Sequence, residues 1–547
     1  MPTVAHVFAR TLADLGVARM YGLPGGEILD LVEACRLEGI RFVLTRREAT
    51  ASFMADAAGQ LERRPGVAVA TLGPGAVNMV LGVANAYLDR SPVLAITASL
   101  ATSVAPYSTH QNLDLNAVYR PFTKASWTLD GRGTEARVRE AWALAKAARP
   151  GPVHLALPSD VARMEDQPAA ESRHALSSPV GPPAQHAIEW MRAVIGAARR
   201  PVVILGLDLA PYERTEVLTQ FIETLGVPVF VAPKAKGAWP ETHPLFCGVC
   251  AGVAADHVIV DFFRQADLLL GIGYDPVESN RAWHHAMRLA SIGPLSIAAD
   301  AFRPYAECVG EVDATLGALL ERPLGPFEWR SEDIDTFRAQ MAACLQPSAG
   351  GLEGHGGRER RGVSPCQLTR RLRALTPADA IVTTDVGAVK FITSQVFTVD
   401  EPMRFLQSNG LSSMGFALPA AMAARLVYPD RPVLCTVGDG GFGMSLAEVE
   451  TCVRERLHFV IVVYNDRQLS LIQVIQQNKG LPPWAVEYGD VDFAAAARAL
   501  GAVGYGVTSL DELDGVMAEA WERDRLVVVD VRVDPREYAS HTRPCGL

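Results

Sequence analysis

Short runs of β-branched and aliphatic residues recur along the chain and alternate with segments of helical periodicity. This rhythm is typical of parallel βαβ units, in which a helix follows each buried strand and crosses back over the sheet. The apolar runs fall into three groups, and each group predicts four strands of one sheet. The predicted strands are 41–45, 67–72, 92–97 and 153–157, then 201–206, 227–231, 267–273 and 295–298, and finally 380–384, 432–437, 458–464 and 527–531.

Two stretches rich in helix breakers separate these groups and predict the domain boundaries. They lie at about 163–184 and at the glycine-rich segment 346–362, whose composition suits exposed linkers. The chain has 547 residues, and a single core rarely grows beyond about 250–300 residues. The sequence therefore predicts an α/β protein with three doubly wound parallel-sheet domains, over 1–163, 185–345 and 363–535, with 346–362 as a linker.

Charge and composition exclude several classes of partner. The formal net charge of −10 disfavours nucleic acid, because phosphate backbones need clustered Lys and Arg. No run of about 18 uninterrupted apolar residues is present, so we expect no membrane span. The nine cysteines follow no regular spacing, which favours a reducing, cytoplasmic compartment. We interpret Cys247 and Cys250 as core residues, since no second pair stands at zinc-ligand spacing.

Two aspartates follow predicted strands of the third group. The strand at 432–437 leads into Gly438-Asp439-Gly440-Gly441, the strand at 458–464 leads into Asn465-Asp466, and 27 residues separate Asp439 from Asp466. One strand–helix–strand crossover uses about that length, so both carboxylates should reach the same edge of the sheet. Such a pair suits Mg²⁺, which takes few protein ligands and shares its sphere with substrate phosphates. Taken alone, Gly-Asp-Gly is more often an ordinary turn than a metal site.

Glu48 lies directly after the predicted strand 41–45 and before an apolar helix over 49–58. A carboxylate at a helix start commonly satisfies free N–H groups or the helix dipole. The residue pattern alone leaves this structural role open beside a chemical one.

Together these segments resemble the thiamine-diphosphate enzyme superfamily over about residues 3–535, in the order pyrimidine-binding, central and diphosphate-binding domain. Gly-Asp-Gly followed at this distance by Asn-Asp is similar to the motif that anchors the cofactor's diphosphate. The resemblance implies that Asp439, Asp466 and the main-chain carbonyl of Gln468 bind Mg²⁺. It also implies that Glu48 is catalytic: it hydrogen-bonds N1′ of the aminopyrimidine and favours the imino tautomer that removes the thiazolium C2 proton.

The resemblance extends to loops around the cofactor. Ser408–Gly415 is similar to the family's segment with a bulky apolar residue between the two cofactor rings, which implies that Met414 is this wedge and that the carbonyl of Ser412 holds the 4′-amino group. Without the flanking match, Met414 would be a core residue and the glycines would be turns. The remaining cofactor contacts implied by the resemblance are Gly25, Gly73, Gly75, Asn78, Gly387, Gly438, Gly440, Gly441 and Leu471.

Three further segments resemble the acetolactate synthase branch. The loop around His110 and Gln111 is similar to the acceptor-side loop of these enzymes, which implies contacts with the substrate, although an ordinary loop role stays equally open. The segment 271–278 resembles the Gly-Tyr-Asp-Pro form of the catabolic, flavin-free enzymes, which argues against FAD. Ile475 stands where the biosynthetic enzymes carry the Trp that shapes acceptor choice, so the acceptor is not predicted.

The activity implied by the resemblance is decarboxylation of a 2-oxo acid, with pyruvate as the expected donor, followed by carboligation to a second carbonyl compound. It also implies a homodimer or homotetramer with the active site at the dimer interface. Two alternatives share this chemistry: a specialised-metabolism enzyme similar to carboxyethylarginine synthase, and a simple 2-oxo acid decarboxylase. A non-catalytic scaffold is disfavoured, because Glu48, Asp439 and Asp466 are all intact.

Overall fold

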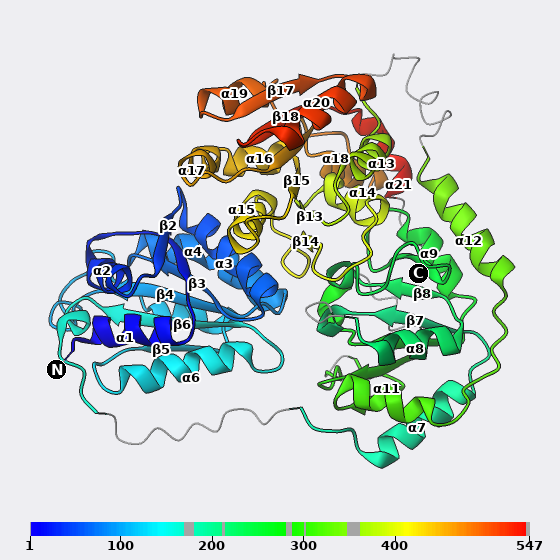
Figure 1. Ribbon diagram of the computed structural model, residues 1–547, viewed down its shortest axis with the longest axis horizontal. Helices are drawn as coiled ribbons and strands as arrows, with labels where there is room; N and C mark the ends of the chain where they lie inside the picture. Colours follow the sequence, from blue (N-terminus) through cyan, green and yellow to red (C-terminus); the bar gives the residue numbers. More distant parts are fainter. Residues whose placement is uncertain are drawn as a thin grey trace. The chain divides into compact units, whose positions relative to one another are not determined.

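The computed structural model describes residues 2–168, 180–209, 214–279, 287–299, 302–346 and 362–542. They form three six-stranded parallel sheets whose strands alternate with helices (Figure 1). The strand order reverses within each sheet, as in doubly wound folds. The predicted α/β class with three such sheets is therefore confirmed. Most of the predicted linker, 347–361, lies outside the described residues, and the domain boundaries stay predictions.

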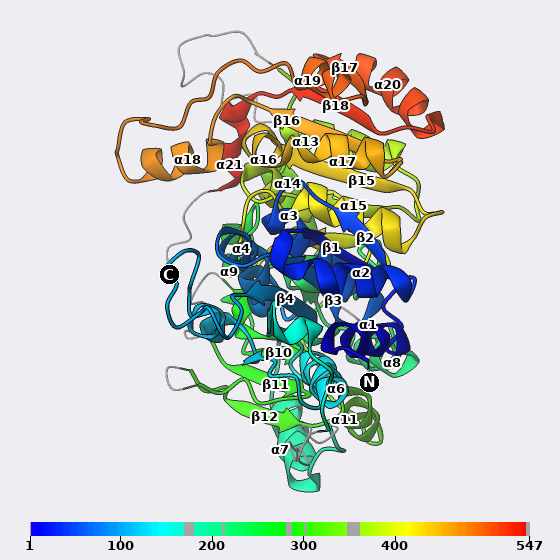
Figure 2. The same ribbon diagram turned by 90° about the vertical axis from the view of Figure 1, so that its left-hand side faces the viewer.

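The first sheet has the strand order β2-β1-β3-β4-β6-β5. Its two longest strands, β4 and β6, are buried almost throughout, as expected for parallel strands covered on both faces. Helices α1 and α6 pack together over this sheet (Figure 2). The strands are β1 (Arg19–Leu23), β2 (Arg41–Leu44), β3 (Gly66–Ala70), β4 (Val93–Ser99), β5 (Ala125–Thr128) and β6 (Pro152–Pro158), and the helices are α1 (Val4–Asp14), α2 (Leu29–Leu37), α3 (Glu48–Glu62), α4 (Pro74–Leu88), α5 (Leu115–Tyr119) and α6 (Thr134–Lys146).

The second sheet has the order β12-β11-β10-β7-β8-β9. The strand predicted at 295–298 is wrong: the chain forms β11 just before it and bends at Pro294, which has no N–H for a sheet ladder. The strands are β7 (Pro201–Leu205), β8 (Val229–Val231), β9 (Phe246–Val249), β10 (Leu268–Ile272), β11 (Leu289–Gly293) and β12 (Ala306–Val309), and the helices are α7 (Gln185–Gly196), α8 (Glu216–Leu225), α9 (Asp256–Phe263), α11 (Val312–Leu320) and α12 (Ser331–Cys344).

The third sheet has the order β14-β13-β15-β16-β18-β17 and carries the predicted aspartates at the ends of its central strands. The strands are β13 (Ile381–Thr384), β14 (Phe405–Gln407), β15 (Val433–Gly438), β16 (Val460–Asn465), β17 (Val503–Val507) and β18 (Val527–Arg532), and the helices are α13 (Pro365–Leu375), α14 (Ala388–Val396), α16 (Asp439–Ser445), α18 (Ser470–Asn478), α19 (Phe493–Ala499), α20 (Leu510–Glu522) and α21 (Tyr538–His541).

The described residues form two compact units. The first contains the first sheet together with 410–430 and 445–458, which include α15 (Ala417–Val427) and α17 (Glu448–Arg454). Within it, α15 packs on α3, where the rings of Phe416 and Phe53 meet edge to face at 5.8 Å. The second unit contains the second and third sheets. Across the described parts of both units, every helix is too short or too polar to cross a membrane.

Candidate active site

Glu48 is the first residue of α3 and is buried, with 5% of its surface exposed. Its carboxylate oxygen Oε2 accepts a hydrogen bond from Asn78 Nδ2 at 3.2 Å, its one side-chain hydrogen bond to the described residues. The side chain does not cap its own helix. A buried carboxylate with a single neutral donor is poorly compensated, and Oε1 accepts no hydrogen bond from the described residues, so it can accept one from a further donor. An aminopyrimidine ring nitrogen that carries a proton fits this need.

Glycines bring the main chain close to this carboxylate. A Cβ at Gly75 would lie 3.1 Å from Glu48 Oε1 and 2.8 Å from Thr71 Cγ2, and a Cβ at Gly25 would lie 2.4 Å from Thr71 Oγ1. Thr71, which the sequence analysis did not single out, therefore connects the two predicted glycine loops. The structure brings together Glu48, Gly25, Gly75 and Asn78 around it.

The loop between β4 and α5 carries His110 and Gln111, and both are exposed. Gly73 has φ +56°, and a Cβ there would lie 2.9 Å from Gln111 Cβ. Gln111 itself has φ +56°, in the left-handed region that non-glycine residues seldom adopt. The structure thus places Gln111 against the glycine loop that leads to Asn78, while the substrate contacts of both loop residues stay predictions.

Tyr119, which lies near Glu48, and His154, which stacks on Tyr119, were not identified from the sequence. The Tyr119 hydroxyl donates to the carbonyl of Ala76 at 2.6 Å, and its ring stacks on His154 with centroids 3.9 Å apart. Burial, followed by the charge of Glu48, raises the pKa of Tyr119. Burial lowers the pKa of His154 to about 3, so the imidazole is neutral. Both rings are therefore uncharged and buried.

Asp439 and Asp466 follow neighbouring parallel strands, because Gly438 of β15 pairs with Tyr464 of β16. Both aspartates thus reach the same sheet edge, as the crossover length predicted. Asp439 Oδ2 accepts from the N–H of Arg467 at 2.5 Å, and Asp466 accepts from the N–H of Gln468 at 3.1 Å.

The two carboxylates oppose each other's ionisation. Burial raises the pKa of Asp439 to about 6, and burial together with the charge of Asp439 raises the pKa of Asp466 to about 7. A divalent cation would relieve this repulsion, and oxygen ligands suit Mg²⁺. The donor chemistry at this edge therefore fits a magnesium ion, with the main chain of Gln468 next to Asp466.

The glycines at this edge allow close approach of the main chain. A Cβ at Gly441 would lie 2.0 Å from Asp385 Oδ2, and the N–H of Gly440 donates to Asp439 Oδ1 at 2.7 Å. Gly387 has φ +117° at the start of α14, and the space beside its Cα is open. Leu471 is partly exposed in the first turn of α18.

Ser412 and Met414 belong to the segment before α15, in the first compact unit. Ser412 is exposed with φ +54°, and Met414 is only partly buried, which does not match a core methionine. The strained main chain at Ser412 is a feature that composition could not reveal.

The described cysteines are free thiols, and most of them are buried. Burial raises the pKa of Cys247 to about 12, which agrees with its interpretation as core. The sequence analysis missed a group formed by Cys366, Glu537 and His541, whose potential ligand atoms lie within 4.8 Å of one another. Cys366 Sγ lies 3.8 Å from His541 Nδ1 and 4.0 Å from His541 Nε2. Because the sulfur is nearly equidistant from both ring nitrogens, it is not directed at the lone pair of either one. We assign no metal to this group.

A buried glutamate beside glycine-rich loops and paired aspartates at a parallel-sheet edge are typical of α/β enzymes that hold a diphosphate through a metal ion. Family models of thiamine pyrophosphate enzymes match the chain in three parts: the N-terminal TPP binding domain at residues 2–118, the central domain at 188–319 and the C-terminal TPP binding domain at 385–531. The chain belongs to this family of enzymes, whose cofactor is also called thiamine diphosphate.

Curated relatives cover nearly the whole chain. It is 30% identical over 550 residues to the catabolic acetolactate synthase of Raoultella terrigena, with 97% of this chain and 95% of that protein covered. It is 29% identical over 540 residues to the acetolactate synthase of Bacillus subtilis, covering 97% and 93%. It is also 29% identical over 553 residues to a probable 2-ketoarginine decarboxylase of Pseudomonas aeruginosa, covering 97% and 94%. The resemblance to acetolactate synthases is confirmed.

Proposed function

We propose that this enzyme decarboxylates a 2-oxo acid, with pyruvate as the donor, and joins the remaining fragment to a second carbonyl compound. The similarity to acetolactate synthases supports this reaction. The observation that carries it is the buried Glu48 carboxylate, whose Oε2 is bound by Asn78 and whose Oε1 accepts no hydrogen bond from the described residues.

When bound, thiamine diphosphate supplies a nucleophilic carbon that adds to the substrate carbonyl and holds the electron pair left by CO₂. Glu48 shares a proton with N1′ of the aminopyrimidine, and Asn78 orients the carboxyl group for this contact. The neutral pair of Tyr119 and His154 introduces no competing charge. The chain's own task at this end of the cofactor is therefore proton placement by a buried carboxyl group.

At the other end of the cofactor, Asp439, Asp466 and the carbonyl of Gln468 would hold Mg²⁺ and, through it, the diphosphate. The raised pKa values of the aspartates support this role, because a divalent cation stabilises both charged carboxylates. We further propose a homodimer or a homotetramer in which each site takes Glu48 from one chain and Asp439 from another, as the family resemblance implies.

The substrate carboxylate would meet His110 and Gln111, which lie on an exposed loop. A second candidate function is decarboxylation without carboligation, favoured by the similarity to a probable 2-ketoarginine decarboxylase. Ile475 is 41% exposed on α18, so its side chain is available to contact an acceptor substrate. An isoleucine at this position does not discriminate between the two functions.

Flavin is not expected in the central sheet. Glu278 is buried, and its Oε2 accepts from the N–H of Leu207 at 2.6 Å, just after β7. The strand order reverses between β7 and β10, where doubly wound sheets bind nucleotide phosphates through such N–H groups. Because this N–H already has a partner, we propose that the enzyme works without FAD. The eight free thiols among the described residues favour a reducing, cytoplasmic setting.

The test is incubation of the purified enzyme with pyruvate, Mg²⁺ and thiamine diphosphate, followed by acid treatment and a colour assay for acetoin. Acetoin formed only after acid shows that acetolactate was made. Acetaldehyde with no acetolactate would favour the decarboxylase. If pyruvate is not consumed and no CO₂ is released, pyruvate is rejected as the donor. An absorbance spectrum of the same preparation should lack the flavin band at about 450 nm.

A further inference from the structure

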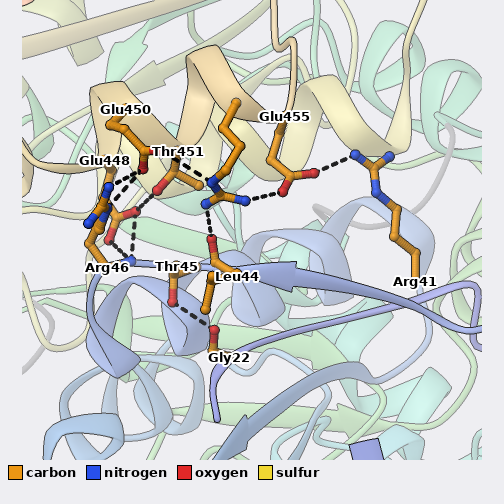
Figure 3. A network of polar contacts seen from close by, with 10 residues as sticks. Gly22, Arg41, Leu44, Thr45, Arg46, Glu448, Glu450, Thr451 and Glu455 are labelled. Carbon is orange, nitrogen blue, oxygen red and sulfur yellow. Dashed lines mark hydrogen bonds and ion pairs between the residues drawn. The ribbon is translucent and has the colours of Figure 1, made fainter. Parts of the chain in front are cut away.

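The residues before Glu48 are held by a helix that is distant in sequence. Three residues connect the end of β2 at Leu44 to Glu48, and the N-cap residue Arg47 makes no side-chain capping bond. Helix α17 supplies contacts to this connection from 402 positions away, as Figure 3 shows. Both segments belong to the first compact unit.

Glu448 makes the central contact in this group. Its Oε1 and Oε2 accept from the main-chain N–H of Arg46 at 3.0 and 3.2 Å, and Oε2 also accepts from Thr451 Oγ1 at 2.7 Å (Figure 3). The side chain is buried, with 1% of the residue exposed. Burying a carboxylate is costly unless it is hydrogen-bonded, and here the partners are an amide and a hydroxyl. The contact therefore fixes the main chain rather than a mobile side chain.

Exposed charges surround this contact. Arg46 Nε donates to Glu450 Oε2 at 2.8 Å, and Arg454 Nη2 donates to the carbonyl of Leu44 at 2.5 Å. Arg41 pairs with Glu455 at 2.5 Å (Figure 3). Solvent screens exposed ion pairs, so each contributes little by itself. They align α17 along the end of β2, and the buried carboxylate of Glu448 determines where the amide of Arg46 lies.

We propose that Glu448 is a positioning residue for Glu48. The inference rests on the proposed function, in which Glu48 shares a proton with the aminopyrimidine. Because the amide of Arg46 lies two residues before Glu48, Glu448 sets where α3 begins and the direction in which the Glu48 side chain leaves it. Asn78 constrains the same carboxyl group from the other side.

Proton sharing is sensitive to such placement. A donor and acceptor must lie about 2.6–3.2 Å apart, and a displacement of about 1 Å can slow a reaction on the order of 10²-fold. If the contact only stabilised the fold, its loss would lower the melting temperature and leave the proton transfer unchanged in the folded, cofactor-saturated enzyme. This difference separates the two roles.

The experiment measures hydrogen–deuterium exchange at C2 of the bound cofactor, quenched in acid and read by NMR, in the full-length enzyme at saturating Mg²⁺. Glu448→Gln keeps the volume but replaces one acceptor oxygen by an NH₂ donor, so the amide of Arg46 loses one of its two acceptors. We expect exchange about 10–100-fold slower than in the parent, with a much smaller change in cofactor affinity by fluorescence titration. Glu448→Asp should recover part of the rate.

Glu450→Gln is the matched control, because Glu450 lies on the same helix and, among the described residues, its carboxylate binds only the side chains of Arg46 and Arg454. Its exchange rate should stay within about twofold of the parent. If Glu448→Gln does not fold, Thr451→Val removes one partner of Glu448 at equal volume and should slow exchange about two- to fivefold.

Glu48→Gln, measured in parallel, separates two kinds of failure. Slow exchange in Glu48→Gln with parental exchange in Glu448→Gln and Thr451→Val would overturn the positioning role alone. Parental exchange in Glu48→Gln as well would overturn the proposed function and the inference together. Equal slowing in Glu448→Gln and Glu450→Gln would also contradict the inference, since the exposed charges would then be sufficient.

Discussion

Glu48 differs from an ordinary carboxylate at a helix start in what surrounds it. It is buried, accepts from Asn78 and leaves Oε1 free of partners in the described part of the chain. The residue pattern permitted both a cap and a proton-sharing group. The side-chain geometry supports the second role, because the carboxylate does not bond to its own helix.

Replacing Glu48 by Gln should slow the chemistry far more than it weakens cofactor binding. The amide keeps the volume and a hydrogen bond but cannot pass a proton to N1′. General acid–base groups typically contribute about 10²–10⁴-fold, and we expect C2 exchange to slow by a factor in this range. The measurement is acid-quenched exchange read by NMR. Parental exchange in this variant would return Glu48 to a purely structural role.

Gly441 offers a steric test at the aspartate pair. A Cβ there would lie 2.0 Å from Asp385 Oδ2, so Gly441→Ala should displace the start of α16 and weaken thiamine diphosphate binding at least about 10-fold. Gly443 lies in the same helix with open space at its Cβ position, which makes Gly443→Ala the matched control. Titration of intrinsic fluorescence with cofactor at fixed Mg²⁺ compares the two. Equal affinities would show that the main chain at Gly441 is not part of the cofactor site.

The residues that the sequence could identify are those at strand ends and in glycine loops. Asp439 and Asp466 meet because β15 and β16 are adjacent, which the crossover length predicted. Thr71, Tyr119 and Glu448 were missed. Each carries an ordinary residue type, and each acts through a contact with a distant segment that no local pattern encodes.

At the scale of elements, the strands missed from the sequence are mostly edge strands. Each sheet has six strands where four were predicted, and five of the six edges were not identified. Edge strands such as β5 and β17 are short and only partly buried, and β17 contains two glycines, so their apolar signal is weak. The interior strand β1 was missed because Arg19 and Gly22 interrupt its apolar run.

The buried His154, at the contact between α5 and β6, makes the stability of the protein depend on pH. His154 is fully buried on β6 between the hydroxyls of Thr97 and Ser126 and the ring of Tyr119. Its pKa is lowered to about 3, below the ordinary value near 6.5, because burial disfavours the charged form. Between these two pKa values, His154 is therefore protonated in the unfolded chain but neutral in the folded protein. Stability contributed by the neutral ring is present above pH 6.5 and is lost as the pH falls toward 3, by about 1.4 kcal/mol per pH unit.

Between pH 7.5 and 5.5, the apparent melting temperature of the parent should fall further than that of His154→Gln, by about 2–4 °C. His186→Gln, at an exposed position, serves as the control and should follow the parent. Thermal unfolding of the three proteins in matched buffers provides the comparison. Identical pH dependence in the parent and His154→Gln would show that the ring is not excluded from protonation.

At the scale of the whole molecule, the sequence predicted three sheets in order, and the described chain contains all three. What it could not predict is that 410–430 and 445–458 leave the third group of strands and join the unit of the first sheet. The packing of α15 on α3 and the ion pairs of α17 with β2 create this arrangement. Both depend on side chains more than 300 positions apart, which periodicity along the chain does not record.

The central claim is that the Glu48 pocket and the Asp439–Asp466 pair of two different chains serve one thiamine diphosphate. Two singly altered chains test it without a known substrate. Glu48→Gln should bind the cofactor and exchange its C2 proton slowly, whereas Asp439→Ala should fail to retain the cofactor on gel filtration, because the diphosphate loses its metal.

The decisive measurement is C2 exchange in a mixed dimer of one Glu48→Gln chain and one Asp439→Ala chain, isolated by two different affinity tags. If the site is shared between chains, one site combines the intact Glu48 of one chain with the intact Asp439 of the other. The account predicts about one bound cofactor per dimer, exchanging at the parental rate. One bound cofactor that exchanges as slowly as in the Glu48→Gln homodimer would place both residues of a site on the same chain and contradict the account.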